Sequence, residues 1–389
     1  MFSAGFRPFF LLAGIWAAVA VPLWLAAYSA GLVLPGVLPP TTWHAHDMVF
    51  GFAFAAAAGF LLTAIPNWTG RLPVRGAPLA ALVALWFAGR AALLLSARIG
   101  PAAAATIDLA FPVALVAVVA REILAGRNWR NLPMVGALAL LFTGSLLVHL
   151  EALGMAGTAA LGNRIGIGTF LMLIALIGGR IVPSFTRNWL ARMRPGGALP
   201  ASKGRLDAAA LAITVAALGA WVAAPESSTA RALCFAASVA LAVRLARWRG
   251  WATLREPLLF ILHVGYAWLP AGLLLVAAQA FLPRLPASAA LHALTVGAIG
   301  TMTLAVMTRA SRGHSGRPLT ADWPTGFIYV LVTAAAVLRV SAPLAGADYL
   351  AHARAAGAAW SAAFLLFALS YGRILLNLPP KTTQGPDKP

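Results

Sequence analysis

About twelve apolar segments of roughly 20 residues follow one another along the 389-residue chain, and they restrict it to a membrane-spanning fold. A helix needs about 20 apolar residues to cross a hydrocarbon core of roughly 30 Å. Hydrophobic residues make up 61% of the chain and charged residues only 10%, a balance that soluble domains do not have. The sequence therefore predicts an all-α, polytopic transmembrane helix bundle with spans near 9–33, 45–66, 78–97, 103–121, 133–153, 165–184, 207–224, 229–246, 257–281, 286–308, 325–344 and 355–375.

The chain has a net charge of +19 at pH 7, and its Lys and Arg residues are distributed among the connections as the predicted topology requires. When alternate connections are assigned to one side of the membrane, 21 of the 29 Lys and Arg residues lie on that side and 5 on the other. Connections rich in Lys and Arg stay in the cytoplasm, so both termini are predicted to be cytoplasmic. The charge then contacts anionic lipid headgroups, and we expect the lipid bilayer, not nucleic acid, as the partner of this surface.

The chain reads as one transmembrane domain, 1–378, followed by a polar tail, 379–389, that is predicted to be disordered. The longest polar connection lies near 185–207 and separates two sets of about six spans. The first apolar stretch is long and lacks a small-residue cleavage site, which indicates a first span and not a cleaved signal peptide. The single cysteine, Cys234, lies within a span, and no CxxCH string is present, so any haem must be bound non-covalently.

The string WHAHDM at 43–48 places two histidines and an aspartate at the entrance of the second span. Ionisable side chains are costly at this level, so they usually mark a site. His44 and His46 are two residues apart and point roughly 200° apart on a regular helix, which favours two different sites over one chelate. Asp47 shares the face of His44 and can orient a neighbouring ligand histidine. The alternative is a hydrated helix entrance with interfacial polar groups.

The tenth span carries His292 in the string LHALTVGAIGTMTLAVM. By the predicted topology it lies at a depth similar to that of His44 and His46, so a haem with two histidine ligands can bridge spans two and ten. Gly297 and Gly300 remove side chains from this helix and allow a flat macrocycle or another helix to approach. The simpler alternative for His292 is one hydrogen bond between helices.

Three further residues are also candidates. His263 in the ninth span is a candidate for a second cofactor or a proton route, and His149 at the outer end of the fifth span can complete a metal site with the span-two histidines. Arg180, at the predicted inner end of the sixth span, can pair with a haem propionate or extend to the interface. Three other membrane-level charges are assigned no role: Asp108 lies near a span start, and Arg90 and Arg339 can be interfacial.

Five strings together resemble the NnrS family: GFRPFF, WHAHDMVFGF, GFLLTAIPNWTGR, GGRIVPSFTRNWL and HALTVGAIGTMTLAVMTRASRGHSGRPL. The resemblance implies a bacterial inner-membrane protein of about twelve spans, with haem b and copper as cofactors and a role in the response to nitric oxide and nitrosative stress. It points to His44, His46 and His292 as cofactor-binding residues. The family commonly has glutamate where this chain has Asp47. A looser similarity to haem-copper oxidases, which carry ligand histidines on spans two and ten, favours the same haem placement.

The leading hypothesis is a membrane protein that binds haem and copper and handles nitric oxide, as ligand or by redox conversion. As an enzyme it would be an oxidoreductase acting on nitric oxide, with a quinol or a redox protein as electron donor. The alternatives are a transporter for a metal, haem or nitrosyl species, and an assembly factor for denitrification enzymes. The chain has no Walker A, HExxH or GxSxG string, so the sequence gives no sign of an ATP motor, a zinc protease of that type or a serine hydrolase.

Overall fold

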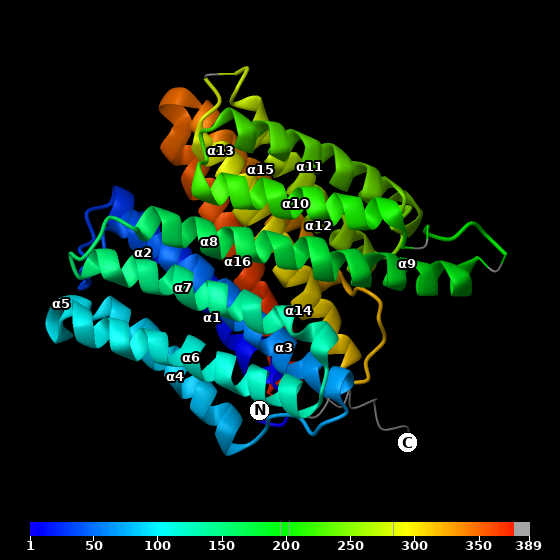
Figure 1. Ribbon diagram of the computed structural model, residues 1–389, viewed down its shortest axis with the longest axis horizontal. Coiled ribbons are helices and arrows are strands. Elements are labelled where there is room, and N and C mark those ends of the chain that lie inside the picture. Colours follow the sequence, from blue (N-terminus) through cyan, green and yellow to red (C-terminus); the bar gives the residue numbers. More distant parts are fainter. Residues whose placement is uncertain (195, 202, 283, 377–389) are drawn as a thin grey trace, which may run out of the picture.

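A computed structural model describes residues 1–194, 196–201, 203–282 and 284–376, and within them twelve helices are long and apolar enough to cross a membrane (Figure 1). The predicted all-α bundle of about twelve spans is confirmed. Nine spans contain one long α-helix each: α1 Phe6–Ser29, α4 Ala77–Leu94, α6 Pro101–Ala125, α7 Pro133–Ala152, α10 Arg205–Ala223, α11 Ser228–Ala246, α12 Pro257–Ala278, α15 Trp323–Ser341 and α16 Tyr349–Leu375.

The second, sixth and tenth spans are interrupted by π-helix, in which the hydrogen bonds run from residue i to i+5. Each consists of three consecutive elements: α2 Pro40–His46, η1 Asp47–Ala53 and α3 Phe54–Thr69; α8 Ala159–Leu173, η3 Ile174–Gly178 and α9 Gly179–Met193; α13 Ala287–His292, η5 Ala293–Gly300 and α14 Thr301–Gly313. Proline is tolerated at the first helical position because its missing N–H has no partner there. It starts several helices: Pro40, Pro101, Pro133 and Pro257.

The interrupted spans form the centre of the bundle. In the most apolar part of the second and tenth spans 72% and 67% of the residues are buried, against 33% in the seventh and eighth. In Figure 1, α8 and α9 cross the molecule as one long helix, with α10 and α11 above and α4 and α6 below. Because π-helical segments are frequent at functional sites, we expect the functional site in these central spans.

Indole rings occupy the space beside Gly297 and Gly300 of the tenth span. A Cβ at Gly297 would lie 2.6 Å from the ring of Trp268, and a Cβ at Gly300 would lie 2.5 Å from the ring of Trp360. The close approach expected at these glycines is therefore made by neighbouring side chains from α12 and α16.

The sixth span is longer than predicted. The sequence places its end near residue 184, but α9 continues to Met193 and takes up part of the expected polar connection. Arg180 thus lies within a continuous helix and not at its end. The polar part of α9 stays helical because its apolar residues, such as Val182 and Leu190, are buried while charged residues face outward.

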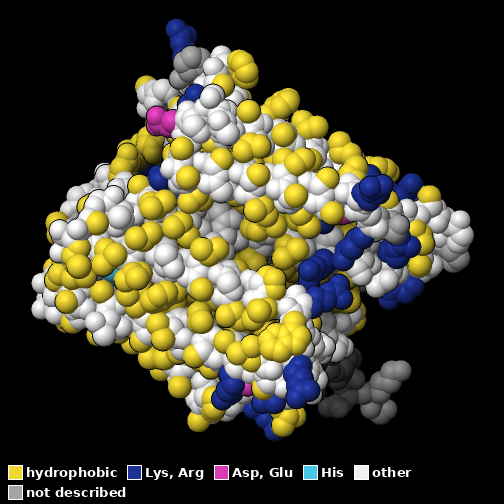
Figure 2. All heavy atoms as spheres, viewed as in Figure 1, with side chains coloured by type: hydrophobic (Ala, Val, Ile, Leu, Met, Phe, Trp, Pro, Cys, Tyr) yellow, Lys and Arg dark blue, Asp and Glu magenta, His cyan; other side chains and the backbone are white. Residues whose placement is uncertain are grey.

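Both ends of the described chain lie at one end of the bundle. The guanidinium of Arg7 donates from Nη1 to the carbonyl oxygen of Ile374, 2.5 Å away. On the face seen in Figure 2, Lys and Arg side chains gather at the end where α9 terminates. This asymmetry agrees with an even number of spans; the cytoplasmic location of that end stays a prediction. The single-domain prediction for 1–378 also stays a prediction, and the tail 379–389 lies outside the described residues.

Candidate functional site

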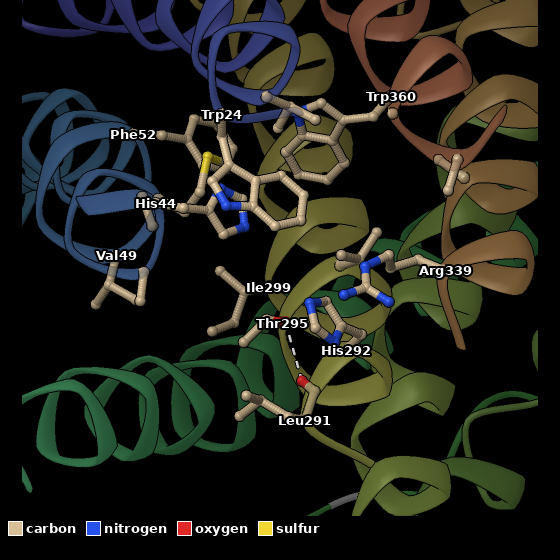
Figure 3. A pocket seen from close by; sticks show the side chains of 18 of the residues that line it. Trp24, His44, Val49, Phe52, Leu291, His292, Thr295, Ile299, Arg339 and Trp360 are labelled. Atoms are coloured by element: carbon tan, nitrogen blue, oxygen red, sulfur yellow. Dashed lines mark hydrogen bonds between the residues drawn. The ribbon is translucent and has the colours of Figure 1, made fainter. Parts of the chain in front are cut away.

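A cavity in the central spans brings together two of the sequence-predicted histidines, His44 from α2 and His292 from α13 (Figure 3). The space between its walls, together with the part that opens to the outside, amounts to about 870 Å³. Its other walls are apolar and aromatic, with Trp24 and Trp360 among them. Arg339, for which the sequence suggested no role, adds a cation to the lining. Such a cavity, mostly apolar with a few polar groups, is typical of a cofactor site.

The tautomer of His292 is fixed by its own helix. Its Nδ1 lies 2.6 Å from the carbonyl oxygen of Ser288, which can only accept, so Nδ1 carries the proton and donates. The lone pair therefore remains on Nε2. Metal-ligating histidines commonly hold their second nitrogen in this way, and the ring of His292 is thus prepared to act as a ligand.

His44 is held by stacking. Its ring lies against the indole of Trp24, with centroids 4.2 Å apart and planes 22° apart. Its Nδ1 is buried and has no hydrogen-bond partner among the described residues. A buried imidazole nitrogen without a partner costs free energy unless another group satisfies it.

Arg339 is 9% exposed, and its Nη1 is likewise buried without a hydrogen-bond partner in the part of the chain that the structure describes. In Figure 3 its guanidinium lies beside His292. A guanidinium at the wall of an apolar cavity suits a carboxylate ligand. Arg180 does not line this cavity; it is half-buried on α9, next to Gly179, which packs against Arg244.

A second site, here called the Arg90 cluster, lies beside the cavity and consists of His46, Asp47, Arg90, Asp108 and His149. All five residues are at most 4% exposed. Arg90 and Asp108, to which the sequence analysis assigned no role, are thus buried within the protein. Their charges are tolerated at depth because each carboxylate pairs with the same guanidinium.

The geometry of the Arg90 cluster centres on Asp108. Arg90 donates from Nη1 to Oδ1 of Asp47 at 2.7 Å and from Nη2 to Oδ1 of Asp108. His149 Nε2 lies 2.9 Å from Asp108 Oδ2, and His46 Nε2 lies 3.5 Å from the same oxygen. One ligand atom from each of His46, Asp108 and His149 can be chosen so that all lie within 4.8 Å of one another. This donor set can hold a metal ion.

The Arg90 cluster has an unbalanced charge and two buried polar atoms without hydrogen-bond partners among the described residues. With neutral imidazoles, two carboxylates and one guanidinium give a net charge of −1. Among the described residues, His46 Nδ1 and Asp47 Oδ2 are buried without hydrogen-bond partners, and they lie 3.9 Å apart. A proton or a monovalent cation would balance the charge.

The structure separates His44 from His46, as their spacing predicts: one lines the cavity and the other joins the Arg90 cluster. It places His149 beside His46, with ring centroids 5.3 Å apart. Asp47 accepts a hydrogen bond from Arg90 of α4. It is also the first residue of the π-helix η1.

Sequence reasoning missed Arg90, Asp108 and Arg339. The signal was present, because each is an ionisable residue inside an apolar segment. A second signal is Gly89, where a Cβ would lie 2.6 Å from Asp108 Oδ1. The glycine lets α4 approach the carboxylate on α6 closely, which brings its neighbour Arg90 within reach.

His263 lies apart from both sites. It is on α12, 5% exposed, and its Nε2 lies 2.9 Å from the hydroxyl oxygen of Thr186. It lines neither the cavity nor the Arg90 cluster. The described residues therefore do not bring His263 together with His44 or His292.

A comparison with curated proteins gave no match. The profile of one protein family, described as NnrS protein, matches residues 1–378, nearly the whole chain and including every residue of the cavity and of the Arg90 cluster. The chain belongs to the NnrS family.

Proposed function

We propose that this protein binds haem b in the cavity between His44 and His292 and copper at the Arg90 cluster, and that it acts on nitric oxide in the bacterial inner membrane. The observation that carries the proposal is the pair of histidines that face one apolar cavity from two central spans. The proton of His292 is held on Nδ1 and Nδ1 of His44 is unpartnered, so these two residues would hold the haem iron.

The cavity walls suit a porphyrin. Trp360 contributes an aromatic ring to the walls, whereas Trp24 is stacked on His44 and Tyr28, and the aliphatic lining excludes water. Arg339 Nη1 is positioned to donate to a propionate, which makes Arg339 a better candidate than Arg180 for that role. When bound, haem would supply one-electron chemistry, and nitric oxide would bind it only in place of one of the two histidines.

The Arg90 cluster fits a copper ion by donor type and charge. Imidazole is a good copper ligand, and His46, His149 and Asp108 supply two imidazoles and a carboxylate. As Cu(I), the ion would balance the net charge of −1. Asp47 Oδ2, 3.9 Å from His46 Nδ1, would act on that ring through its charge, while Ser145 Oγ lies within hydrogen-bond distance of its Nε2 at 3.1 Å.

Haem and metal analysis of the purified full-length protein tests both assignments. His292→Ala and His44→Ala should each lower haem content or shift the visible spectrum while leaving copper unchanged. His149→Ala should lower copper while leaving haem unchanged. The matched control is His314→Ala, which replaces an exposed histidine outside both sites.

The spectrum of the reduced protein should change on addition of nitric oxide. Folded protein that contains neither haem nor copper would contradict the proposal and direct attention to transport or assembly functions. Full haem content in folded His292→Ala and His44→Ala proteins would contradict the cavity assignment alone.

A further inference from the structure

A groove in the side of the bundle, here called the Arg309 groove, separates α9 from α3 and α14. Among the other spans, α9 packs most closely on α12 and less closely on α3 and α14, so space remains between them. The groove consists of two adjoining cavities that share four lining residues: Phe10, Phe60, Ile181 and Val306. Along the tenth span it extends from Ile299 to Arg309, which is about 15 Å at 1.5 Å per residue.

The Arg309 groove is open to the surroundings of the bundle. Several of its apolar lining residues, contributed by different spans, are only partly buried: Phe60 of α3, Ile181 and Phe185 of α9, and Val306 of α14. Apart from Arg309, the polar side chains of the lining are Thr63, Thr303 and His314. Because these helices are membrane spans, an apolar groove that opens sideways between them is reached from the lipid.

Arg309 lies half-buried at the basic end of the groove, near the end of α14. Its guanidinium is placed over the ring of Phe185, 4.2 Å from the ring centroid. Stacking of this kind covers one face of the guanidinium and leaves the N–H groups in its plane available to acceptors. Within the part of the chain that the structure describes, no carboxylate pairs with Arg309 and no oxygen accepts a hydrogen bond from it.

The charge around Arg309 is not balanced. Glu256 attracts its guanidinium from a distance and Arg192 repels it, so the three residues together carry a net charge of +1. The carboxylate of Glu256 is already engaged, because its Oε1 accepts from the backbone N–H groups of Leu258 and Ala321, each 3.1 Å away. A half-buried guanidinium without a counter-ion is costly, and an anionic ligand would remove that cost.

We propose that the Arg309 groove binds an anionic phospholipid, with its phosphate on Arg309 and an acyl chain along the apolar lining. A guanidinium can bind phosphate through two parallel hydrogen bonds, and basic pockets between membrane spans bind anionic head groups. A small soluble anion would leave the apolar lining uncovered, whereas an acyl chain buries it. This inference goes beyond the proposed function, because the binding of lipid requires neither haem nor copper.

The test uses the purified full-length protein in detergent, freed of co-purified lipid. The probes are dioleoyl phosphatidylglycerol, dioleoylglycerol, which has the same chains without the phosphate, and glycerol phosphate, which has the phosphate without the chains. Native mass spectrometry measures the affinity for each probe. The phospholipid should bind at least about tenfold more tightly than either of the others, since both the charge-assisted hydrogen bonds and the apolar burial are at stake. Affinity for dioleoylglycerol or glycerol phosphate equal to that for the phospholipid would overturn the proposal.

Variants locate the site. Arg309→Gln removes the charge and should abolish the preference for phosphatidylglycerol over dioleoylglycerol. The matched control is Arg205→Gln, which changes an exposed arginine at the start of α10, outside the groove, and should keep the preference. Val306→Trp fills the apolar lining and should weaken the binding of both lipids.

An unchanged preference in folded Arg309→Gln protein would overturn the proposal, as would unchanged lipid affinity in folded Val306→Trp protein. The comparison of the three probes on the unaltered protein stands even if a variant does not fold.

Discussion

At the scale of single residues, the Arg90 guanidinium is the group on which the buried charges of the Arg90 cluster depend. Replacement of Arg90 by Met leaves two buried carboxylates without a cation and makes the net charge of the cluster more negative, from −1 to −2. Breaking a buried ion pair by removing one partner costs about 3–5 kcal/mol of stability. We expect Arg90→Met to lower the free energy of unfolding by about this amount, measured by thermal melting in detergent.

The control for Arg90→Met removes a negative charge from the same cluster instead of the positive one. Asp108→Asn keeps the shape and brings the net charge from −1 to zero, so it should cost less than Arg90→Met. If Asp108→Asn proves the more destabilising of the two, the charge count given for the cluster is wrong. Loss of copper in Asp108→Asn protein is expected in addition, because Asp108 supplies one of the candidate ligand atoms.

At the scale of the helices, the tenth span positions both a candidate ligand and the cavity wall. Gly300→Ala would bring a Cβ to 2.5 Å from Trp360, which lines the cavity, so the ring or the helix must move. Overpacking of this kind costs about 1–3 kcal/mol. We expect a lower melting temperature and weaker haem retention.

Gly136→Ala is the matched control for Gly300→Ala. It is also a glycine within a helix, α7, but no atom lies within 4 Å of its added Cβ. Because alanine favours a helix over glycine, this change should raise stability slightly. Equal behaviour of the two variants would argue against a tight contact between η5 and α16.

The start of α15 depends on Asp322, which accepts hydrogen bonds from the backbone N–H of Thr325 at 3.1 Å and from Arg312 Nη1 at 2.9 Å. Burial alone would raise the pKa of Asp322, but the hydrogen bonds from Thr325 and Arg312 outweigh it and lower the pKa below its ordinary value. A lowered pKa means that the ionised carboxylate stabilises the fold above its ordinary pKa and loses this effect as pH falls through the folded-state pKa.

Asp322→Ala should therefore cost about 1 kcal/mol near neutral pH, the usual effect of losing a helix cap. The difference from the unaltered protein should shrink in acid, as melting curves recorded from pH 7 down to pH 3 would reveal. A difference that grows toward low pH would contradict the direction of the pKa shift.

The helices could be predicted from sequence because span length and apolar composition are local properties. The separation of His44 from His46 also follows from regular helical spacing. The partner of Asp47 could not be predicted, because Arg90 lies on another span, α4, and the spacing along one helix does not record which spans pack together. The pairing of Arg90 with Asp108 depends on how closely α4 and α6 pack, which no periodicity along the chain records.

At the scale of the whole molecule, both candidate sites lie near the end of the bundle opposite the basic loops. The start of α2, the end of α4, the end of α7 and the start of α13 meet there, and each connection at that end is poor in Lys and Arg. If the basic end is cytoplasmic, haem and copper would lie in the outer half of the membrane. The orientation of the chain in the membrane therefore decides from which compartment a ligand reaches the two candidate sites.

Labelling of introduced cysteines measures that sidedness directly. The sole native cysteine, Cys234, is fully buried and should give little background. Val33→Cys and Phe281→Cys change residues that are 87% and 85% exposed, in connections at the sparsely charged end, whereas Leu72→Cys changes one that is 81% exposed at the basic end. A membrane-impermeant maleimide should label the first two in intact cells and Leu72→Cys only after the inner membrane is opened. The reverse pattern would place both candidate sites in the cytoplasmic half and would require the positive-inside assignment to be abandoned for this chain.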